Sequence, residues 1–257
     1  MGNKSTRLES KVIIVTGGSS GIGRAVAERV AAEGATVVIA ARRKDAGEEV
    51  AATIRTAGGK AHFVATDVTV EADMAALVRT TVSEFGRLDG AFNNAGSVAA
   101  FGPVQGISDQ DWRTDLEQNL TSVFYGLKHQ VPAILAAGRG GAIVNNASNL
   151  GAVGMAAVAP YVAAKHGIVG LTRSVALETA EQGVRVNALL TGGVDTPGFR
   201  ESMGTTPEAV AQIAALHPLG RISQPAEIAA FVAFLLSDES TFVTGAALAI
   251  DGGFTAR

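Results

Sequence analysis

The chain has 257 residues, 47% of them hydrophobic, and a formal net charge of −3, so it can bury one full core as a single domain. The negative charge argues against a protein that binds nucleic acids regardless of sequence, because such a protein needs a basic face. The chain contains no cysteine, its four histidines lack metal-ligand spacing, and no uncharged apolar run reaches the ~18 residues of a membrane span, so we expect a cytoplasmic protein without metal or membrane contacts.

A glycine-rich turn, TGGSSGIG at 16–23, joins the first predicted strand to the first predicted helix. The run KVIIVTG at 11–17 is short and β-branched and ends at glycine, which is typical of a strand buried on both faces. From residue 22 to residue 34, alanine and valine recur at helical spacing up to a closing glycine. The free N–H groups and the positive dipole end of this helix point into the turn, which favours binding of an anion such as a pyrophosphate.

The three glycines of this turn have separate expected roles in binding a dinucleotide. Gly17 allows the tight turn, Gly21 lets a phosphate come close, and Gly23 lets the helix pack on the strand. The alternative, a glycine-rich surface turn, is disfavoured because a strand precedes the motif and a helix follows it. We expect cofactor contacts from Gly17, Ser19, Ser20, Gly21, Ile22 and Gly23.

Strands and helices alternate along the rest of the chain, which predicts an α/β fold with a parallel sheet and helices on both of its faces. Further strands are expected at 35–41, 60–66, 88–92, 142–146 and 246–250, together with one that ends near residue 190. Further helices are expected at 44–57, 71–85, 108–138, 161–180 and 224–236.

The second strand ends in Ala41-Arg42-Arg43, where the adenosine ribose of a bound dinucleotide should lie. A carboxylate there would accept hydrogen bonds from a free 2′-hydroxyl and repel a 2′-phosphate, whereas arginines attract the phosphate. The sequence therefore favours NADP(H) over NAD(H), with Arg42 and Arg43 as candidate contacts. The alternative is that both arginines form a solvated helix entrance.

Two further turns follow predicted strands and supply candidate cofactor contacts. Asp67 and Val68 come directly after the third strand, within reach of an adenine, although an aspartate at this place is as often a helix N-cap. Asn94, Ala95 and Gly96 form a polar turn after the fourth strand, at the edge of the sheet where ligands of open α/β sheets bind. Asparagine in such a turn is often turn chemistry alone.

The helix expected at 161–180 carries Tyr161 and Lys165 one turn apart on one face. An ammonium beside a phenol stabilises the phenolate, so we expect Lys165 to lower the pKa of Tyr161 from a reference value of about 10. Ser148 lies just past the end of the preceding strand, and Asn119 lies on the long helix before that strand. For the Tyr-Lys spacing taken alone, an ordinary exposed pair is the alternative.

Together these motifs resemble the short-chain dehydrogenase/reductase family, on the strength of TGGSSGIG, the NNAG turn at 93–96, Asn119, Ser148, Tyr161 and Lys165. The resemblance covers nearly the whole chain, from residue 11 to residue 253. It implies one Rossmann-type domain at 11–257 with a seven-stranded parallel sheet, an N-terminal extension at 1–10 and a substrate lid at about 193–218. It also implies a homotetramer.

The resemblance further implies hydride transfer between a nicotinamide and a carbonyl or alcohol carbon. Tyr161 is then the general acid in reduction, and Ser148 holds the substrate oxygen. Lys165 binds the nicotinamide ribose and tunes Tyr161, while Asn119 supports a water relay. Two hydroxyl donors suit this chemistry because hydride delivery builds negative charge on the carbonyl oxygen. Further cofactor contacts are implied at Gly192, Val194 and Thr196, and substrate contacts at Ser148, Tyr161, Gly193 and Phe199.

Two positions depart from the family pattern. Ala147-Ser148 stands where the family often has two serines, and Gly151, three residues later, supports Ser148 as the catalytic one. Thr191 stands where the family usually has a proline, beside the expected nicotinamide site.

The leading hypothesis is an NADPH-dependent carbonyl reductase or alcohol dehydrogenase. The alternative enzyme is a 3-oxoacyl-[acyl-carrier-protein] reductase, for which Lys128 and Arg173 are either docking cations or ordinary surface charges. A nucleotide-binding protein without turnover is disfavoured, because it has no need for the four catalytic residues. The substrate is left open, since the apolar lid residues Phe199 and Met203 fit a hydrophobic pocket and a core equally well.

Overall fold

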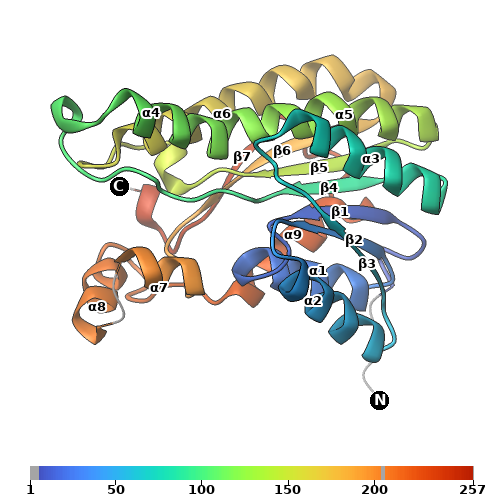
Figure 1. Cartoon of the computed structure of the whole chain (residues 1–257), viewed down its shortest axis with the longest axis horizontal. Helices are drawn as coiled ribbons and strands as arrows, with labels where there is room; N and C mark the ends of the chain where they lie inside the picture. Colours follow the sequence, from blue (N-terminus) through green and yellow to red (C-terminus); the bar gives the residue numbers. More distant parts are fainter. Residues whose placement is uncertain (1–5, 204–205, 257) are drawn as a thin grey trace.

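Seven parallel strands form one sheet within residues 6–203 and 206–256, which the computed structural model describes. Their order is β3-β2-β1-β4-β5-β6-β7 (Figure 1). The strands are β1 (Val12–Thr16), β2 (Thr36–Ala41), β3 (Lys60–Ala65), β4 (Gly90–Asn93), β5 (Gly141–Asn146), β6 (Val184–Thr191) and β7 (Ala247–Ile250). The predicted Rossmann-type fold with a seven-stranded parallel sheet is confirmed.

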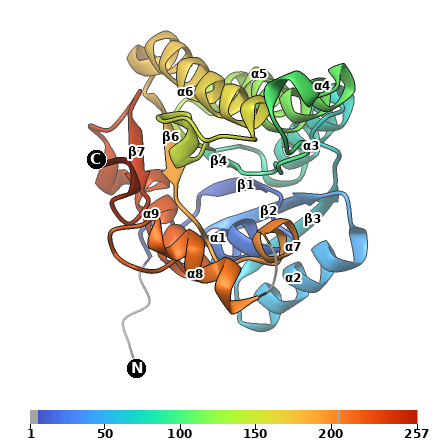
Figure 2. The same ribbon diagram turned by 90° about the vertical axis from the view of Figure 1, so that its left-hand side faces the viewer.

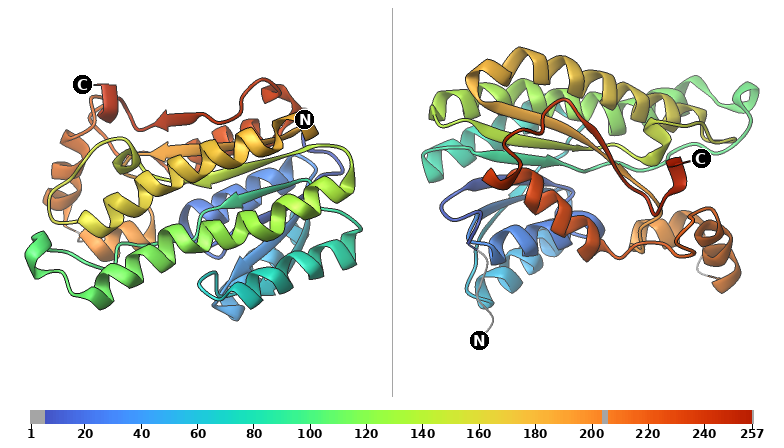
Figure 3. Two further views of the ribbon diagram at one scale, coloured as in Figure 1. Left: turned by 90° about the horizontal axis from the view of Figure 1, so that it is seen from above. Right: turned by 180° about the vertical axis from the view of Figure 1, so that it is seen from behind.

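Helices cover both faces of this sheet (Figures 1 and 3). One face carries α1 (Gly21–Ala32), α2 (Lys44–Thr56) and α9 (Pro225–Leu236), and the other carries α3 (Glu71–Phe85), α5 (Ser122–Ala137) and α6 (Ala159–Thr179). Three more helices, α4 (Asp109–Leu116), α7 (Pro197–Met203) and α8 (Pro207–Ala215), lie beyond the carboxyl ends of the strands (Figure 2). The chain therefore builds its functional edge from the segments that follow the strands.

The central strand β1 explains why the sheet has a hydrophobic core on each face. All five of its residues are buried, and successive side chains point to opposite faces. Ile13 and Val15 pack into the core beneath α1 and α9, whereas Val12 and Ile14 pack into the core beneath α3 and α5. A β-branched run without polar residues is what burial on both faces requires.

The strand order opens a crevice at the functional edge between β1 and β4. From β1 the chain winds outward to β2 and β3, then returns to β4 on the other side of β1. Crossovers on the two sides of this point leave in opposite directions, so the loops after β1 and β4 separate there. This switch point brings the TGGSSGIG turn and the NNAG turn together.

Most predicted element bounds agree with the structure within one or two residues, but the long helix expected at 108–138 is interrupted. It consists of α4, a π-helical turn at Glu117–Thr121 and α5. Ser108 caps its start, since its hydroxyl accepts a hydrogen bond from the backbone N–H of Asp111 at 3.1 Å. The π-helical turn contains Asn119, and such insertions are common at functional sites.

Residues 6–10, which the sequence assigns to an N-terminal extension, pack onto the domain. Leu8 is fully buried in the core beneath α1, and Arg7 pairs with Glu33 and Glu239. Residues 1–5 of that extension lie outside the described part of the chain. Among the described residues, no helix combines the length and the apolarity needed to cross a bilayer.

Candidate active site

The TGGSSGIG turn has the backbone that the sequence analysis requires of it. Gly17 and Gly21 have φ values of 65° and 52°, a region that favours glycine. A Cβ on Gly23 would lie 2.2 Å from the carbonyl O of Gly17, so only glycine lets α1 pack this closely. Ser20 caps α1 without a side-chain hydrogen bond to the helix, so its hydroxyl does not compete for the first N–H groups. The turn fits a pyrophosphate.

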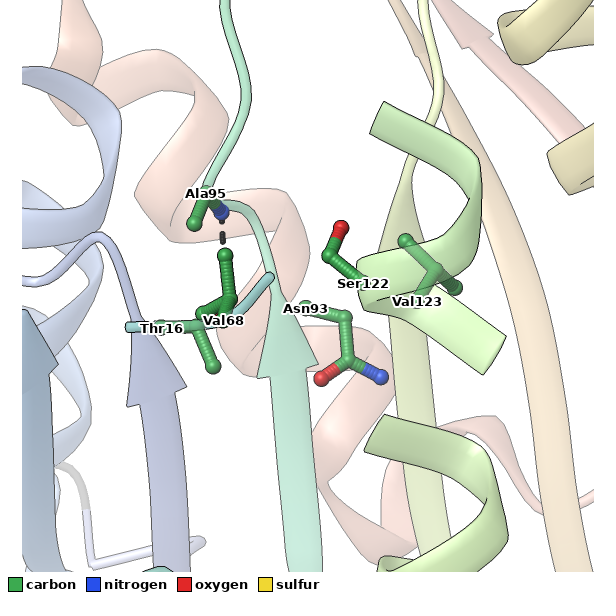
Figure 4. Close-up of a pocket in the computed structure, with 6 residues that line it drawn as sticks. All are labelled: Thr16, Val68, Asn93, Ala95, Ser122 and Val123. Carbon is green, nitrogen blue, oxygen red and sulfur yellow. Dashed lines mark hydrogen bonds between the residues drawn. The ribbon is translucent and has the colours of Figure 1, made fainter. Parts of the chain in front are cut away.

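Hydrogen bonds hold the end of β4 against the end of β1. The hydroxyl of Thr16 accepts the backbone N–H groups of Asn94 and Ala95 at 2.9 and 3.2 Å, and the Asn94 amide donates to the carbonyl O of Thr16 at 3.1 Å. A small pocket lies at this junction (Figure 4). It is lined by Thr16, Val68, Asn93, Ala95, Ser122 and Val123. The predicted contacts Val68 and Ala95 therefore share one pocket.

The end of β2 presents two unpaired arginines at the expected ribose position. Ala41 ends the strand, and Arg42 and Arg43 are exposed. Neither guanidinium makes a hydrogen bond or an ion pair with the residues that the structure describes. Asp67 lies close enough for Arg42 to lower its pKa, although the hydroxyl of Thr69 lowers it more.

Asp67 itself is engaged in turn chemistry. Its Oδ1 accepts hydrogen bonds from the backbone N–H and the hydroxyl of Thr69 at 3.0 and 2.7 Å. It is not the N-cap of α3, because Val70 occupies that position. Asp67 thus forms an Asx turn, which the sequence analysis did not consider beside the helix cap and the adenine contact. This turn fixes the loop that carries Val68.

Tyr161 and Lys165 lie together on the first turns of α6, beneath the loop that carries Ser148. The Nζ of Lys165 lies 5.3 Å from the centre of the Tyr161 ring and donates to the carbonyl O of Asn146 at 2.9 Å. Ser148 is buried and caps a short 3-10 turn, with its hydroxyl accepting the N–H of Leu150 at 3.2 Å. The structure brings these three predicted residues into one cluster.

The expected lowering of the Tyr161 pKa is wrong for this structure. Burial raises the pKa of Tyr161 to about 12, and a hydrogen bond with Ser148 offsets only part of this rise. Burial lowers the pKa of Lys165 to about 7, so its ammonium is itself poorly stabilised. Burial is thus the main cause of the difference, and the Nζ of Lys165 donates to the carbonyl O of Asn146.

Asn119 joins this cluster from the π-helical turn. It is fully buried, and its Nδ2 donates to the carbonyl O atoms of Ser97 and Asp115 at 2.8 and 2.9 Å. Its Oδ1 is buried and accepts no hydrogen bond from the described residues. A Cβ on Gly96 would lie 2.5 Å from this Oδ1 and 3.7 Å from the Nζ of Lys165, so glycine is required there. The orphaned oxygen and the ammonium border the same small space.

The loop after β6 closes the site from the other side. Val194 pairs with Ser223 in an isolated β-bridge. A Cβ added to Gly21 would lie 3.1 Å from the methyl group of Thr196, so this loop lies against the glycine turn. The hydroxyl of Thr196 accepts the backbone N–H of Phe199 at 3.1 Å, which starts α7. The predicted contacts at Gly192, Gly193, Val194 and Thr196 therefore lie on a loop that reaches the glycine turn. The side chain of Met203 lies outside the described residues.

The sequence analysis missed two buried polar residues. His217 accepts the backbone N–H of Gly193 at its Nε2, at 3.0 Å, and thus ties the segment after α8 to the loop after β6. Asp115 is fully buried beside Asn119. A signal for Asp115 existed, since it lies four residues before Asn119 and so on the same helical face. No pattern pointed to His217.

Comparisons with known proteins identify relatives of this chain. Residues 17–255 match a family model described as enoyl-(acyl carrier protein) reductase. A 2,5-dichloro-2,5-cyclohexadiene-1,4-diol dehydrogenase from Sphingobium indicum is 45% identical over 249 residues, covering 97% of this chain and 98% of the relative. A cyclohexanol dehydrogenase from an Acinetobacter species is 42% identical over 253 residues, covering 98% of each. The crystal structure of carveol dehydrogenase from Mycobacterium avium in complex with NAD superposes with a TM-score of 0.93 at 30% identity, covering 98% of this chain and all of that one.

Proposed function

The chain belongs to the short-chain dehydrogenase/reductase family and acts on alcohol or carbonyl groups with a nicotinamide cofactor, and from this premise we propose an NADP(H)-dependent dehydrogenase of alicyclic secondary alcohols. The observation that supports the chemistry most strongly is the cluster of the buried Ser148, Lys165 and Asn119 with the half-buried Tyr161 beside the glycine turn. The observation that favours NADP(H) is the pair of unpartnered arginines that follows Ala41.

The proposed chemistry assigns each residue of the cluster a task. The cofactor supplies the hydride acceptor or donor. In alcohol oxidation, Tyr161 takes the hydroxyl proton, and the hydroxyl of Ser148 holds the substrate oxygen in place. In reduction, both hydroxyl groups donate to the oxygen on which negative charge develops, which stabilises the transition state more than the ground state.

Lys165 and Asn119 support this proton transfer. Since burial raises the pKa of Tyr161 to about 12, a positive charge nearby is needed to make the phenolate accessible. Lys165 carries the nearest ammonium, and its free N–H groups suit the nicotinamide ribose. The orphaned Oδ1 of Asn119 faces the same space as Nζ and suits a water relay between them.

Removing the phenol hydroxyl tests this assignment. Tyr161→Phe should lower kcat by at least about a hundredfold, since general acid–base catalysis contributes roughly 10²–10⁴-fold, while NADPH binding stays nearly intact. The chain has two tyrosines, so Tyr125→Phe on α5 is the matched control. Activity of Tyr161→Phe within tenfold of the unmodified protein would remove Tyr161 from the mechanism.

Coenzyme choice is tested at Arg42. A charge-assisted hydrogen bond to the 2′-phosphate contributes roughly 1.5–3 kcal/mol, so Arg42→Ala should weaken NADPH binding about ten- to a hundredfold and spare NADH. Arg79→Ala, an exposed arginine on α3, should change neither affinity. Fluorescence titration with both cofactors measures the effect, and equal affinity of the unmodified protein for NADPH and NADH would contradict the proposal.

The substrate class rests on the relatives, whose names specify dehydrogenases of cyclohexanol and of a chlorinated cyclohexadienediol. Of the two candidate docking cations for the alternative acyl-carrier substrate, Lys128 is paired with Glu71 at 2.5 Å, whereas Arg173 is exposed and makes no ion pair with the described residues. A panel of cyclohexanol, cyclohexanediols, linear secondary alcohols and acyl thioesters separates these classes. Turnover of thioesters in preference to cyclic alcohols would favour the alternative.

A further inference from the structure

Asp115 is a buried carboxylate without an ion-pair partner. Its side chain has no exposed surface, and no lysine or arginine nitrogen of the described residues comes within 4 Å of it. Burying an unpaired charge costs several kcal/mol, so such groups are rare outside functional sites. The position lies in the last turn of α4, two residues before the π-helical turn that holds Asn119.

Three N–H groups hold this carboxylate. Its Oδ1 accepts from the backbone N–H of Ala99 and from the Nδ2 of Asn119, both at 3.2 Å, and its Oδ2 accepts from the backbone N–H of Ala100 at 3.1 Å. Every one of these partners is a donor. A protonated carboxyl group would direct its own O–H at one of them, so the arrangement favours the anion.

The anion determines which way the Asn119 amide faces. The Nδ2 of Asn119 has three acceptors around it, the carbonyl O atoms of Ser97 and Asp115 and the Oδ1 of Asp115. The amide oxygen must then point the other way, to the space beside Gly96 that the Nζ of Lys165 also borders. If the side chain of residue 115 were neutral and presented a donor to Asn119, the hydrogen bond from the Asn119 Nδ2 to Oδ1 of residue 115 would be lost.

Few other charges face Asp115. Burial is the largest contribution to the raised pKa of Asp115. The charge of Asp111, on the same helix, raises this pKa further. On α6, the ionised Asp115 raises the pKa of both Lys165 and Tyr161. The loop at 96–100 presents only backbone groups and the Ser97 hydroxyl. Among the residues that the structure describes, Lys165 is thus the one cation that the charge of Asp115 stabilises.

We propose that Asp115 is a positioning residue that fixes the Asn119 amide with its oxygen towards Lys165 and serves as the buried countercharge of the Lys165 ammonium. This inference rests on the proposed roles of Asn119 and Lys165 in catalysis. It adds a fifth residue, which acts through these two and does not itself touch the substrate.

The titration of Lys165 in the ligand-free protein tests the countercharge directly. The chain has six lysines, and burial lowers the pKa of Lys165 to about 7, so its Cε signal should titrate near neutral pH in the NMR spectrum of ¹³C-lysine-labelled protein. Asp115→Asn should move this titration to lower pH by about half a unit or more. Asp109→Asn, which removes an exposed carboxylate from the same helix, should not move it. An unchanged Lys165 titration in a folded Asp115→Asn protein would overturn the proposal.

A measurement on the unmodified protein keeps the proposal testable if Asp115→Asn does not fold. Two coupled groups respond to each other's titration, so the Cγ signal of Asp115 should show an inflection at the pH where Lys165 loses its proton. Absence of that inflection would count against the countercharge in the same way that an unchanged lysine titration would.

Kinetics separate positioning from a general structural role. Loss of a nearby negative charge lowers the pKa of both Tyr161 and Lys165, so the pH profile of kcat/KM for alcohol oxidation should shift to lower pH in Asp115→Asn. A merely structural defect would lower the rate without moving the profile. The Tyr161→Phe variant distinguishes the two levels of the proposal. If Tyr161→Phe is inactive but the Asp115→Asn profile stays in place, the function stands and only the role of Asp115 is wrong.

Discussion

Lys165 is a single residue at which the proposed chemistry and the stability of the fold make opposite demands. Its side chain is 4% exposed, and its Nζ donates to one backbone carbonyl, that of Asn146. Desolvation moves its pKa from 10.5 to about 7, which means that the folded state holds the proton less tightly than the unfolded chain does. A charge that catalysis needs is therefore costly to the ligand-free protein.

Lys165→Met should raise the melting temperature while it abolishes turnover. Because the folded-state pKa lies below the unfolded value, the cost of Lys165 is complete below pH 7 and shrinks as the pH rises towards 10.5. The gain should be a few kcal/mol at pH 6, or about 5–10 °C, and smaller at pH 9. Thermal unfolding at both pH values measures it, with Lys60→Met on β3 as the exposed control. If Lys165→Met raises the melting temperature equally at both pH values, the cost of burying the Lys165 charge is not the cause of the gain.

At the scale of elements, regular patterns in the sequence predicted most of the structure. The helix expected at 71–85 has the bounds of α3, because acidic residues start it and Gly86 ends it in a left-handed conformation. Strands β1 and β2 were predictable since β-branched runs with almost no polar residues are typical of strands buried on both faces. The four catalytic candidates came from family motifs, and the structure places them in one cluster.

What the sequence did not predict depends on packing between distant elements. The π-helical turn at 117–121 keeps a helical period on both sides, so periodicity alone does not show the extra residue. The raised pKa of Tyr161 depends on how deeply α6 and its neighbours bury the phenol. His217 has its role because α8 folds back over the loop at Gly193, which no local pattern encodes.

Thr191 ends β6 at the position where the family usually has proline. Its hydroxyl lies 3.4 Å from the Oδ1 of Asn146, a long contact that contributes little. Ala188 and Gly192 donate their N–H groups towards β7, so the N–H of Thr191 points to the β5 side. The pairing of β5 ends at Asn146 with Leu189, so this N–H lies beyond the ladder. Proline should therefore remove no sheet hydrogen bond here.

We expect Thr191→Pro to be tolerated and to stabilise the fold by about 0.4–1 kcal/mol, because proline restricts the unfolded chain. Thr191→Val, which removes the hydroxyl but keeps the N–H, should be nearly neutral. Thermal unfolding and steady-state kinetics of both variants decide the matter. If proline lowers both the melting temperature and kcat while valine does not, the N–H of Thr191 holds the nicotinamide-side loop, and the expected contacts at Val194 and Thr196 need revision.

At the scale of the whole molecule, α5 and α6 form the outer layer on one face of the sheet (Figure 3). Helix α6 carries apolar or small residues around much of its circumference, yet Ala164 and Ile168 are fully buried within the chain. The large apolar side chains left exposed on this layer are Phe124 at the start of α5 and Leu177 at the end of α6, which are 46% and 83% exposed. The large exposed apolar side chains that favour association therefore lie at the two ends of this pair of helices.

A symmetric partner would cover both ends at once. The strands before α5 and α6 are parallel, so the two helices run in the same direction, and Phe124 and Leu177 lie at opposite ends. A two-fold axis that lies in the plane of the interface and is perpendicular to the helices makes the helices of the two subunits antiparallel. It would bring Phe124 of one subunit near Leu177 of the other. Leu177→Glu should therefore lower the mass measured by light scattering at micromolar concentration, because a buried carboxylate opposite Phe124 is costly. Val82→Glu on the neighbouring helix α3, a 36% exposed apolar residue, should leave the mass unchanged. A monomeric unmodified protein would contradict the homotetramer, and an assembly that survives Leu177→Glu would place the interface on another face.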